Sequence, residues 1–506
     1  MSVLKVKFLI VAILLALGGA TAILLAVGGL SHRSTPDWVS EDTSVHSGTA
    51  AASHVQPSQV PQVSLSAFPG GNNKSDQTTW IQNALEQASK KREALHIPRA
   101  AKPYSVRPLQ IPSHTRLVLE SGVVLQTAPG YTQFQRLINI VNVQDVEIAG
   151  YGATLRMNKE EYKNGEYRHC VYISGSTGIE LNGVTCMEPG GDGFYVSGSE
   201  KKPFSENVTL ENVSADGSTR NGLTIISAKN LIVRHSTFSR SAGVKPDSGI
   251  DLEPESPADR LDEVLLEDNT TEQNAGQGIR IAVSKLTPKS HPVQVLISGH
   301  HDRDAGGSSL FATNETRGLR GVSGTVTVEH FSSESPRLYG ILFSFWNSNG
   351  PRAFISEAQI LNANQSRSTD DNAAIGITRG GGGTGYLGNI EFVRTSIRDI
   401  EKTPLIDYYF SFNDYSQKGF SKIAFSQPGV LSGATHQHPL GMIQGQPVET
   451  IDLSDRSGLA DLWKRAQDAT KTKKTLRALT SELSTNNICS TLVKFGQPWD
   501  LVCPEK

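Results

Sequence analysis

Several residue types are scarce in this chain, and each shortage excludes a class of protein. Only 4 of the 506 residues are methionine, a side chain that fills irregular gaps in helical cores, so a large helical protein is not indicated. The net charge is only −2, which gives neither the basic excess typical of nucleic-acid-binding proteins nor an acidic tail. Cysteine is also rare, with 4 residues, so the chain can form two disulfides at most.

The four cysteines fall into two groups. Cys489 and Cys503 flank a short loop near the C-terminus and are the favoured pair. Cys170 and Cys186 are either a second bridge or two buried thiols, and the sequence leaves both possibilities open.

Glycine is abundant instead, with 47 residues, and it marks a repeat in the centre of the chain. A small residue followed by an apolar, a variable and an apolar residue recurs at 170–173, 193–196, 222–225, 249–252 and 278–281. A second set of short apolar runs alternates with the first, at 179–181, 208–210, 231–233, 264–266 and 293–296. Such units bury their apolar faces only by stacking, and they show no helical period. The sequence therefore predicts an all-β fold, a single-stranded right-handed parallel β-helix.

The repeat also places residues of neighbouring copies next to one another. Side chains alternate between the two faces of a strand, so the variable residue of each copy points outward. The predicted outward row contains Tyr172, Tyr195, Thr224, Asp251 and Arg280. A row two residues later contains Ser174, Ser197, Ile226, Glu253 and Ala282, and a row just before the small residues contains His169, Asp192, Asn221, Ser248 and Gln277. Tyrosines, acids, a histidine and an arginine gathered over neighbouring copies indicate a sugar-binding groove.

Five motifs in these copies resemble a known family. They are Tyr167-Arg168-His169, Gly190-Gly191-Asp192-Gly193, Arg220-Asn221-Gly222, Gly249-Ile250-Asp251-Leu252-Glu253-Pro254 and Ala275-Gly276-Gln277-Gly278-Ile279. With these motifs, residues 62–430 resemble the pectate-lyase-like right-handed β-helix superfamily, and within it a group of secreted proteins. The resemblance implies the fold but not the reaction, because lyases, epimerases, hydrolases and non-catalytic binders share this scaffold.

The ends of the chain differ in composition from the repeats. Residues 8–30 carry no charge and follow two lysines, and their length suits a membrane-spanning helix better than a signal peptide. We therefore expect residues 1–30 to be a membrane anchor, or else a cleaved signal, with the bulk of the chain periplasmic or extracellular. Residues 31–62 predict a flexible linker, residues 63–430 the β-helix, and residues 431–506 a helical appendix.

Two further segments border or interrupt the predicted β-helix. Asp76 can cap a helix whose apolar face includes Trp80 and Ile81, and this helix would cover the open N-terminal coil. The insert 299–320 contains the run 300–304, His-His-Asp-Arg-Asp, and histidine and aspartate are metal ligands. Because no matching ligand pair stands elsewhere, a solvated polar loop is the favoured interpretation of this run.

Asp251 and Glu253 are the first candidates for catalysis. They stand two apart on one predicted strand, so both carboxylates point outward about 7 Å apart. That spacing suits the acid and the base or nucleophile of glycoside hydrolysis, and the same hard oxygens suit Ca²⁺. A salt bridge to Arg280 or Arg220 is the structural alternative.

The remaining candidates complete the groove. His169 can take or give a proton near neutral pH, and Asp192 is either a third acid or a turn residue. Arg280, like Arg220, can bind a sugar carboxylate through two parallel hydrogen bonds. The candidates for substrate binding are Tyr172, Tyr195, Arg220 and Asn221. The two tyrosines can stack on sugar rings or donate a proton.

These residues favour an extracytoplasmic enzyme that acts on an acidic, uronate-containing polysaccharide, either a lyase or a C5-epimerase. The two arginines would neutralise the uronate carboxylate, and His169 or a tyrosine would act as base or acid. The pair Asp251 and Glu253 would orient the sugar or hold Ca²⁺. One alternative is a glycoside hydrolase that uses this pair and Asp192. Another is a non-catalytic protein that binds or assembles polysaccharide, and the oligomeric state stays open.

Overall fold

The structure is a computed structural model, and it describes residues 60–71, 75–162, 165–314, 321–365, 373–379 and 385–398. Beyond residue 398 it gives little more than the backbone of individual strands. The chain divides into two compact units, Met1–Pro57 and Ser58–Lys506, and the described residues all belong to the second.

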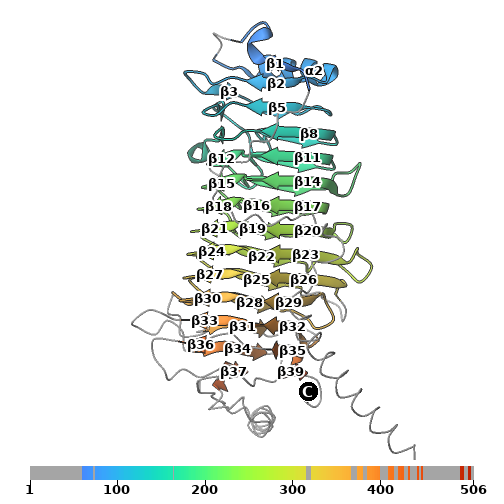
Figure 1. Cartoon of the computed structure of the whole chain (residues 1–506), viewed down its shortest axis with the longest axis vertical. Helices are drawn as coiled ribbons and strands as arrows, with labels where there is room; N and C mark the ends of the chain where they lie inside the picture. The colour runs from blue at the N-terminus through green and yellow to red at the C-terminus, as the bar shows by residue number, and fades with distance from the viewer. Residues whose placement is uncertain are drawn as a thin grey trace, which may run out of the picture. The chain divides into compact units, whose positions relative to one another are not determined.

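This unit is a parallel β-helix of about ten coils built from three sheets, and Figure 1 shows the coils stacked on one another. The sheet that carries the predicted groove, here called the groove sheet, has 13 strands. Its strands are β4 (Leu109–Gln110), β7 (Ile138–Val141), β10 (Val171–Ser174), β13 (Phe194–Ser197), β16 (Leu223–Ile225), β19 (Ile250–Leu252), β22 (Ile279–Ala282), β25 (Leu310–Thr313), β28 (Ile341–Ser344), β31 (Ala373–Arg379), β34 (Tyr408–Asp414), β37 (Gly441–Ile443) and β38 (Gln446–Pro447).

The second sheet, here called the long-strand sheet, has 15 strands. They are β1 (Gln62–Ser64), β2 (Ala94–Ile97), β5 (Arg116–Leu119), β8 (Gln144–Ala149), β11 (Thr177–Asn182), β14 (Ser205–Glu211), β17 (Ala228–Arg234), β20 (Leu261–Glu267), β23 (Val293–Ser298), β26 (Gly324–Glu329), β29 (Arg352–Ser356), β32 (Leu387–Val393), β35 (Phe420–Ser426), β39 (Thr491–Lys494) and β40 (Asp500–Val502). The first apolar set of the repeat thus forms the groove sheet, and the second set forms the long-strand sheet.

The third sheet, here called the short-strand sheet, has 12 strands. The two sets of apolar runs in the sequence did not predict it. Its strands are β3 (Tyr104–Val106), β6 (Val124–Thr127), β9 (Thr154–Arg156), β12 (Thr185–Met187), β15 (Ser214–Asp216), β18 (Thr237–Ser239), β21 (Thr270–Glu272), β24 (His301–Arg303), β27 (Ser332–Glu334), β30 (Gln359–Leu361), β33 (Ser396–Arg398) and β36 (Leu431–Ser432). In most of these short strands only the middle residue faces the core, so the apolar signal is a single residue per coil.

The small residue at the start of each repeat is required by the corner that leads into the groove sheet. A Cβ atom added to Gly222 would lie 2.6 Å from the Cβ atom of Phe238 in the short-strand sheet, closer than real side chains approach. Cys170 occupies the same position in its coil and is disulfide-bonded to Cys186 of β12. Both sulfurs are buried, so the bridge joins the groove sheet to the short-strand sheet through the core.

One α-helix, α2 (Thr78–Lys91), precedes the regular coils of the described region. Its buried face consists of Trp80, Ile81, Ala84, Leu85, Ala88 and Ser89. The backbone N–H of Thr78 donates to Asp76 Oδ1 at 2.9 Å, so Asp76 does satisfy a free N–H group at the helix start. Two short 3₁₀ helices, η2 (Leu65–Ala67) and η3 (Lys159–Glu161), complete the helical elements of this region.

The polar run 300–304 is not the solvated loop that was favoured from the sequence. It contains strand β24, and His300 and Asp302 are both fully buried. Asp302 is the middle residue of β24 and points into the core, where Thr271 of β21 donates a hydrogen bond to it. The loop prediction was wrong because polar residues at the middle of a short strand can be buried when neighbouring coils supply partners.

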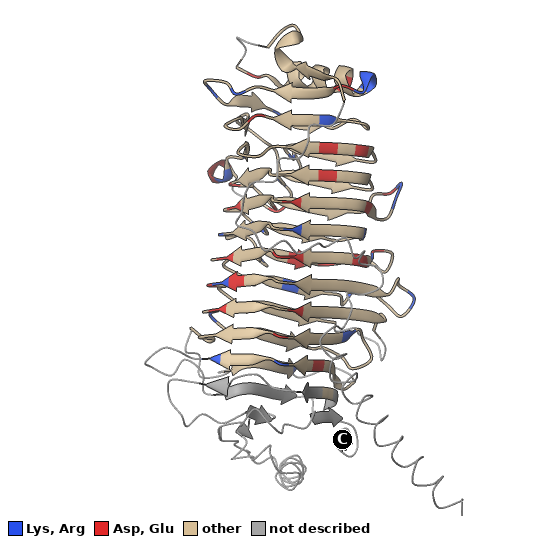
Figure 2. Cartoon of the chain, in the orientation of Figure 1, with Lys and Arg blue, Asp and Glu red and all other residues tan. Residues whose placement is uncertain are grey.

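Figure 2 shows charged residues of both signs distributed along the coils. The predicted anchor at residues 8–30 lies outside the described residues, as do nearly all of the linker 31–62 and the helices predicted for residues 431–506. Within the described ranges no helix is long and apolar enough to cross a membrane. The anchor and the extracytoplasmic location stay predictions.

Candidate functional site

The register of the groove sheet aligns the residues of the predicted outward row. Tyr172 pairs with Tyr195, Tyr195 with Thr224, Thr224 with Asp251, and Asp251 with Arg280. Their strand neighbours face the core, as alternation requires. The outward row is nevertheless well covered, since Thr224 and Asp251 have no exposed surface. Side chains from adjacent coils, which lie about 4.8 Å apart, bury one another.

The row that begins at His169 forms a ladder from side chains to backbone. The backbone N–H of Asp192 donates to His169 Nδ1 at 3.2 Å, and that of Asn221 donates to Asp192 Oδ1 at 2.9 Å. The next coil repeats the contact, because the backbone N–H of Ser248 donates to Asn221 Oδ1 at 2.9 Å. Each side chain thus accepts a hydrogen bond from the backbone N–H of the equivalent residue in the next coil. Asp192 is therefore a buried acceptor at a turn as well as a third acid.

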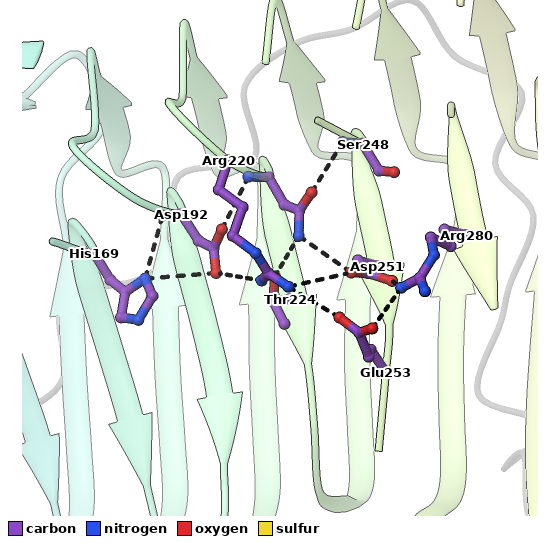
Figure 3. Close-up of polar contacts among 9 residues, drawn as sticks. His169, Asp192, Arg220, Thr224, Ser248, Asp251, Glu253 and Arg280 are labelled. Atoms are coloured by element: carbon purple, nitrogen blue, oxygen red, sulfur yellow. Dashed lines mark hydrogen bonds and ion pairs between the residues drawn. The ribbon is translucent and has the colours of Figure 1, made fainter. Parts of the chain in front are cut away.

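Arg220 and Arg280 connect three acids into one network, which Figure 3 shows spanning the neighbouring strands. Arg220 lies 3.4 Å from Asp192 Oδ2 and donates to Glu253 Oε2 at 2.9 Å. Arg280 Nη1 lies 2.9 Å from Asp251 Oδ1 and 2.9 Å from Glu253 Oε1. The salt bridges that the sequence offered as an alternative are therefore present, and both arginines are already engaged.

Two polar residues of the middle coil tie this network together. Asn221 Nδ2 donates to Asp251 Oδ2 at 3.2 Å and to Thr224 Oγ1 at 3.0 Å. Arg220 also contacts Thr224 Oγ1 at 3.4 Å. The structure thus gathers Asp192, Arg220, Asn221, Asp251, Glu253 and Arg280 into one connected cluster, here called the acid–arginine cluster.

The two carboxyl groups nearest to Arg280 have opposite protonation tendencies. Burial raises the pKa of Asp251 to about 7, although Arg280 and Arg220 oppose this shift. Burial also acts to raise the pKa of Glu253, but Arg280 and Arg220 outweigh it, so this pKa is lowered. A hydrogen bond with Asp251 contributes to that lowering. As the pH falls through about 7 the pair therefore takes up a proton on Asp251, while Glu253 keeps its negative charge.

His169 is neutral in this environment. Burial, followed by the charges of Arg136 and Arg220, lowers its pKa well below the usual value. Its Nδ1 accepts a hydrogen bond from the Asp192 backbone, so the proton of the neutral ring is on Nε2. The approach of Nδ1 to Asp192 Oδ2, 3.5 Å, is then no ion pair. Burial raises the pKa of Asp192 to about 6, so both groups are close to neutral in mildly acidic solution.

His169 and the two tyrosines form a stack of rings. Tyr195 lies 4.4 Å from His169 and 5.5 Å from Tyr172 between ring centroids, with the ring planes within 28° of parallel. The guanidinium carbon of Arg136 lies 3.8 Å from the Tyr172 ring centroid. His169 also lies 5.9 Å from Tyr172, so the three rings pack on one another with the Arg136 guanidinium beside them. Of the two roles predicted for these tyrosines, the arrangement favours hydrogen bonding or proton donation over sugar stacking.

A cleft of about 450 Å³ opens beside the acid–arginine cluster. Its lining is Lys245, Pro246, Ala275, Gly276, Gln277, Arg280, Gly306, Gly307, Phe311, Thr313 and Leu338. Arg280 is the residue shared by the cleft and the cluster, and its side chain is 20% exposed. A ligand in this cleft would therefore reach the cluster through Arg280.

Sequence reasoning missed three contributors to this region. Arg136 precedes the first recognised copy of the repeat, so no periodic signal marked it. Thr224 stands in the predicted row but carries no charge, and its role depends on contacts with Asn221 and Arg220 that only the folded coils bring about. Phe311 lines the cleft because its coil continues the row after Arg280.

The carboxylate pair does not fit the predicted Ca²⁺ site. Asp251 and Glu253 accept hydrogen bonds from the guanidinium of Arg280, and a divalent cation at those oxygens would be repelled by Arg280 and Arg220. No group of three or more His, Cys, Asp or Glu residues is arranged to hold a metal ion within the described part of the chain. No step below is routed through a metal ion, and Ca²⁺ binding stays an untested prediction.

Comparisons with known proteins identify the fold. Residues 143–301 match the family model described as the right handed beta helix region. The A-module of mannuronan C-5 epimerase AlgE4 from Azotobacter vinelandii superposes with a TM-score of 0.54 at 13% identity, covering 75% of this chain and 99% of that one. The AlgE6 A-module from the same organism gives 0.54 at 13% identity, with coverages of 76% and 98%.

A protein of a different kind is equally similar in fold. PfbA, a surface adhesin of Streptococcus pneumoniae, superposes with a TM-score of 0.52 at 13% identity, covering 74% of this chain and 92% of that one. Comparison with curated protein sequences gives no significant match. At such low identities the likeness extends to the fold alone. The chain therefore has the fold of a right-handed parallel β-helix, as its repeats predict.

Proposed function

We propose that this chain is an enzyme that acts on a uronate-containing polysaccharide lying along the groove sheet, as a lyase or C5-epimerase. The observation that carries the proposal is the contact between His169 and Tyr195, a neutral imidazole and a phenol stacked 4.4 Å apart beside the acid–arginine cluster. Removal of the C5 proton needs an unprotonated base, and departure of the leaving oxygen needs a nearby acid.

The two rings have protonation states suited to these roles. The lowered pKa of His169 keeps its imidazole unprotonated at one nitrogen at neutral pH, and burial raises the pKa of Tyr195, so its phenol keeps its proton. His169 is only 2% exposed, whereas Tyr195 is partly exposed, so Tyr195 is the ring of this pair that a sugar can contact. Tyr195 is assigned as the acid. His169 is assigned as the base, a role that requires its Nδ1 to give up the hydrogen bond from the Asp192 backbone N–H when the sugar binds.

Arg280 supplies the positive charge for the uronate carboxylate. It is the more exposed of the two arginines and the one that lines the cleft. Because the pKa of Asp251 is raised to about 7, a large fraction of the molecules carry this acid protonated at neutral pH. In that fraction the two guanidinium groups face only two ionised carboxylates, those of Asp192 and Glu253. An incoming uronate carboxylate can then hydrogen-bond to Arg280 with less competition than three ionised acids would impose.

A glycoside hydrolase is the second candidate, and the divergent pKa values of Asp251 and Glu253 favour it. A pair with one protonated and one ionised carboxyl group is the arrangement used by glycosidases. Both groups hydrogen-bond to the same Arg280 atom at 2.9 Å, so those oxygens are no more than twice that distance apart, which points to the retaining geometry. Against this candidate, Asp251 has no exposed surface.

One experiment separates these candidates. The whole protein is incubated with polymannuronate, polygalacturonate and neutral polysaccharides, and the products are examined for unsaturated ends, new reducing ends and inverted C5 centres. Elimination or inversion supports the leading proposal, whereas reducing ends without unsaturation support hydrolysis. Binding without chemical change would overturn both enzyme proposals in favour of a binding protein.

Variants connect the activity to this site. Asp251→Asn keeps the shape of the side chain, but the amide can neither carry a negative charge nor give up a proton. We expect turnover to fall about a hundredfold or more. His169→Ala should reduce turnover similarly, with the folded state checked by circular dichroism. If both variants keep full activity on the true substrate, this cluster is not the active site. The matched control is Asp304→Asn, an exposed acid outside the cluster.

A further inference from the structure

Two exposed aromatic side chains lie near the beginning of the predicted groove and have no part in the proposed chemistry. Phe134 is 64% exposed and Tyr167 is 38% exposed, and their ring centroids are 5.2 Å apart. The exposed large hydrophobic side chains of the described region are Phe134, Tyr151, Tyr167 and Tyr386. Within this set Phe134 and Tyr167 are in contact with each other, so they present one continuous apolar surface.

The fold holds this pair at one corner of successive coils. Phe134 lies in the turn between β6 and β7, and Tyr167 in the corresponding turn between β9 and β10. Both turns lead from the short-strand sheet into the groove sheet. The aromatic pair therefore stands at the edge of the groove sheet, just before the strands that carry the outward row.

Short connections join the pair to the candidate site. Phe134 is two residues before Arg136, whose guanidinium covers the Tyr172 ring, and Tyr167 is two residues before His169. The turn that carries Tyr167 rests on the glycines before Asp192, because a Cβ atom on Gly191 would lie 2.7 Å from the Glu166 carbonyl oxygen. The charge of Glu166 also helps to raise the pKa of Glu255, so this turn approaches the groove.

We infer that Phe134 and Tyr167 form a sugar-stacking subsite at the end of the predicted groove away from the cleft, where they hold one part of a polysaccharide chain whose other part lies at Arg280. This inference rests on the proposed function, because it assumes that the ligand is a polysaccharide. A pyranose ring has an apolar C–H face, and packing that face on an aromatic ring removes apolar surface from water. The coil of Tyr167 is three coils before that of Asp251, a distance of about 15 Å.

The size of the pair favours a sugar over a protein partner. Two aromatic rings present far less area than the roughly 800 Å² per partner that a stable protein–protein interface buries. The rings of the outward row are also unsuited to stacking, since Tyr172 and Tyr195 cover each other and lie beside Arg136 and His169. The Phe134–Tyr167 pair thus supplies the aromatic surface that the outward row lacks.

The test compares long and short oligosaccharides of polymannuronate and polygalacturonate, using the full-length protein. Phe134→Ala and Tyr167→Ala should each raise the Kd for long chains relative to short ones, by up to about tenfold, because a short oligosaccharide bound at Arg280 in the cleft does not reach the pair. Tyr167→Phe keeps the ring and should restore the wild-type ratio.

Tyr151→Ala is the matched control. Tyr151 is an exposed tyrosine, 44% accessible, in the turn between β8 and β9 that joins the other two sheets, and its removal should leave the length dependence unchanged. If the wild type discriminates by length and the Phe134 and Tyr167 variants keep the same ratio, the subsite is refuted while the proposed function stands. If the wild type neither binds nor converts either polysaccharide, both proposals are refuted together.

Discussion

The buried acid Asp302 should make the stability of this protein depend on pH, and its replacement by asparagine should remove that dependence. Asp302 has no exposed surface, and its Oδ1 accepts a hydrogen bond of 2.6 Å from Thr271. Its Oδ2 has no hydrogen-bond partner among the described residues. Neighbouring His300 is equally buried, and burial lowers the pKa of His300 to about 3, so it supplies no positive charge.

The magnitude follows from the shift in pKa. Burial raises the pKa of Asp302 from its ordinary value of 3.8 to about 7, partly opposed by hydrogen bonds from Ser309 and Thr271. The native state therefore keeps this proton over a range in which the unfolded chain has released it. Because the native state binds more protons there, the free energy of unfolding falls as pH rises from about 4 to about 7. At about 1.4 kcal/mol per pH unit, Asp302 contributes a loss of about 4 kcal/mol.

Urea unfolding followed by circular dichroism at several pH values measures this contribution. The side chain of Asp302→Asn cannot ionise, so this variant lacks the loss of about 4 kcal/mol that Asp302 causes in the wild type between pH 4 and pH 7. The difference in free energy of unfolding, variant minus wild type, should therefore rise by about 4 kcal/mol over this range. At pH 4 the variant should be less stable than the wild type by about 1 kcal/mol, because the amide replaces a carboxylic acid in a close-packed site. Asp192 and Asp251 titrate in both proteins, so their contributions cancel in the comparison.

The control is Asp304→Asn, which changes an exposed acid two residues along the chain. Its stability should follow the pH dependence of the wild type closely, because the charge of Asp304 is the smallest of the causes that shift the Asp302 pKa. Parallel curves for Asp302→Asn and the wild type would refute the reasoning, because they would mean that Asp302 has the same pKa in the folded and the unfolded chain.

Three further predictions concern the groove and the core. Arg280→Lys keeps the charge but loses the planar donor pair, so the KM for an acidic polysaccharide should rise more than kcat falls, as steady-state kinetics would show. Tyr195→Phe keeps the ring stack and removes the hydroxyl, so kcat should fall about a hundredfold while the melting temperature stays unchanged; unaltered kcat would exclude this phenol as the acid. Replacing Cys170 and Cys186 together with alanine removes a disulfide between residues 16 apart in the sequence. Urea unfolding should then show a free energy of unfolding lower by about 3 kcal/mol.

The fold was predictable because its signal recurs. Each coil repeats a small residue and two apolar residues, and the structure places them at a tight corner and on the core face of the groove sheet. The register followed as well, since Tyr172, Tyr195, Thr224, Asp251 and Arg280 align as the repeat predicts. Because the coils stack on one another, residues one repeat apart in the sequence are neighbours in the fold.

What escaped prediction depends on contacts that do not recur. The short-strand sheet has one inward residue per coil, and that residue is variously Cys186, Ala215, Phe238, Thr271 and Asp302. No hydrophobic period can mark so mixed a column. The predicted spacing of about 7 Å for the Asp251 and Glu253 carboxylates also took no account of Arg280, which draws both groups onto one guanidinium nitrogen.

The coils beyond Arg280 show whether the fold itself requires the acid–arginine cluster. In the same outward row Arg280 pairs with Phe311, Phe311 with Leu342, and Leu342 with Gly376. The same sheet therefore continues over several coils with an apolar row. Burying acids and arginines costs desolvation energy that apolar residues avoid, so the cluster is retained for something other than stability.

This argument leads to a last prediction, the replacement of Asp251 by leucine together with Arg280 by phenylalanine. The double variant removes one acidic side chain and one guanidinium group together. It leaves Arg220 paired with Glu253 at 2.9 Å and with Asp192 at 3.4 Å. We expect its free energy of unfolding to stay within about 1 kcal/mol of the wild type, or to exceed it, while turnover of the polysaccharide is lost. A destabilisation of several kcal/mol would instead mean that the buried charges hold the coils together, and the argument that the cluster serves something other than stability would fail.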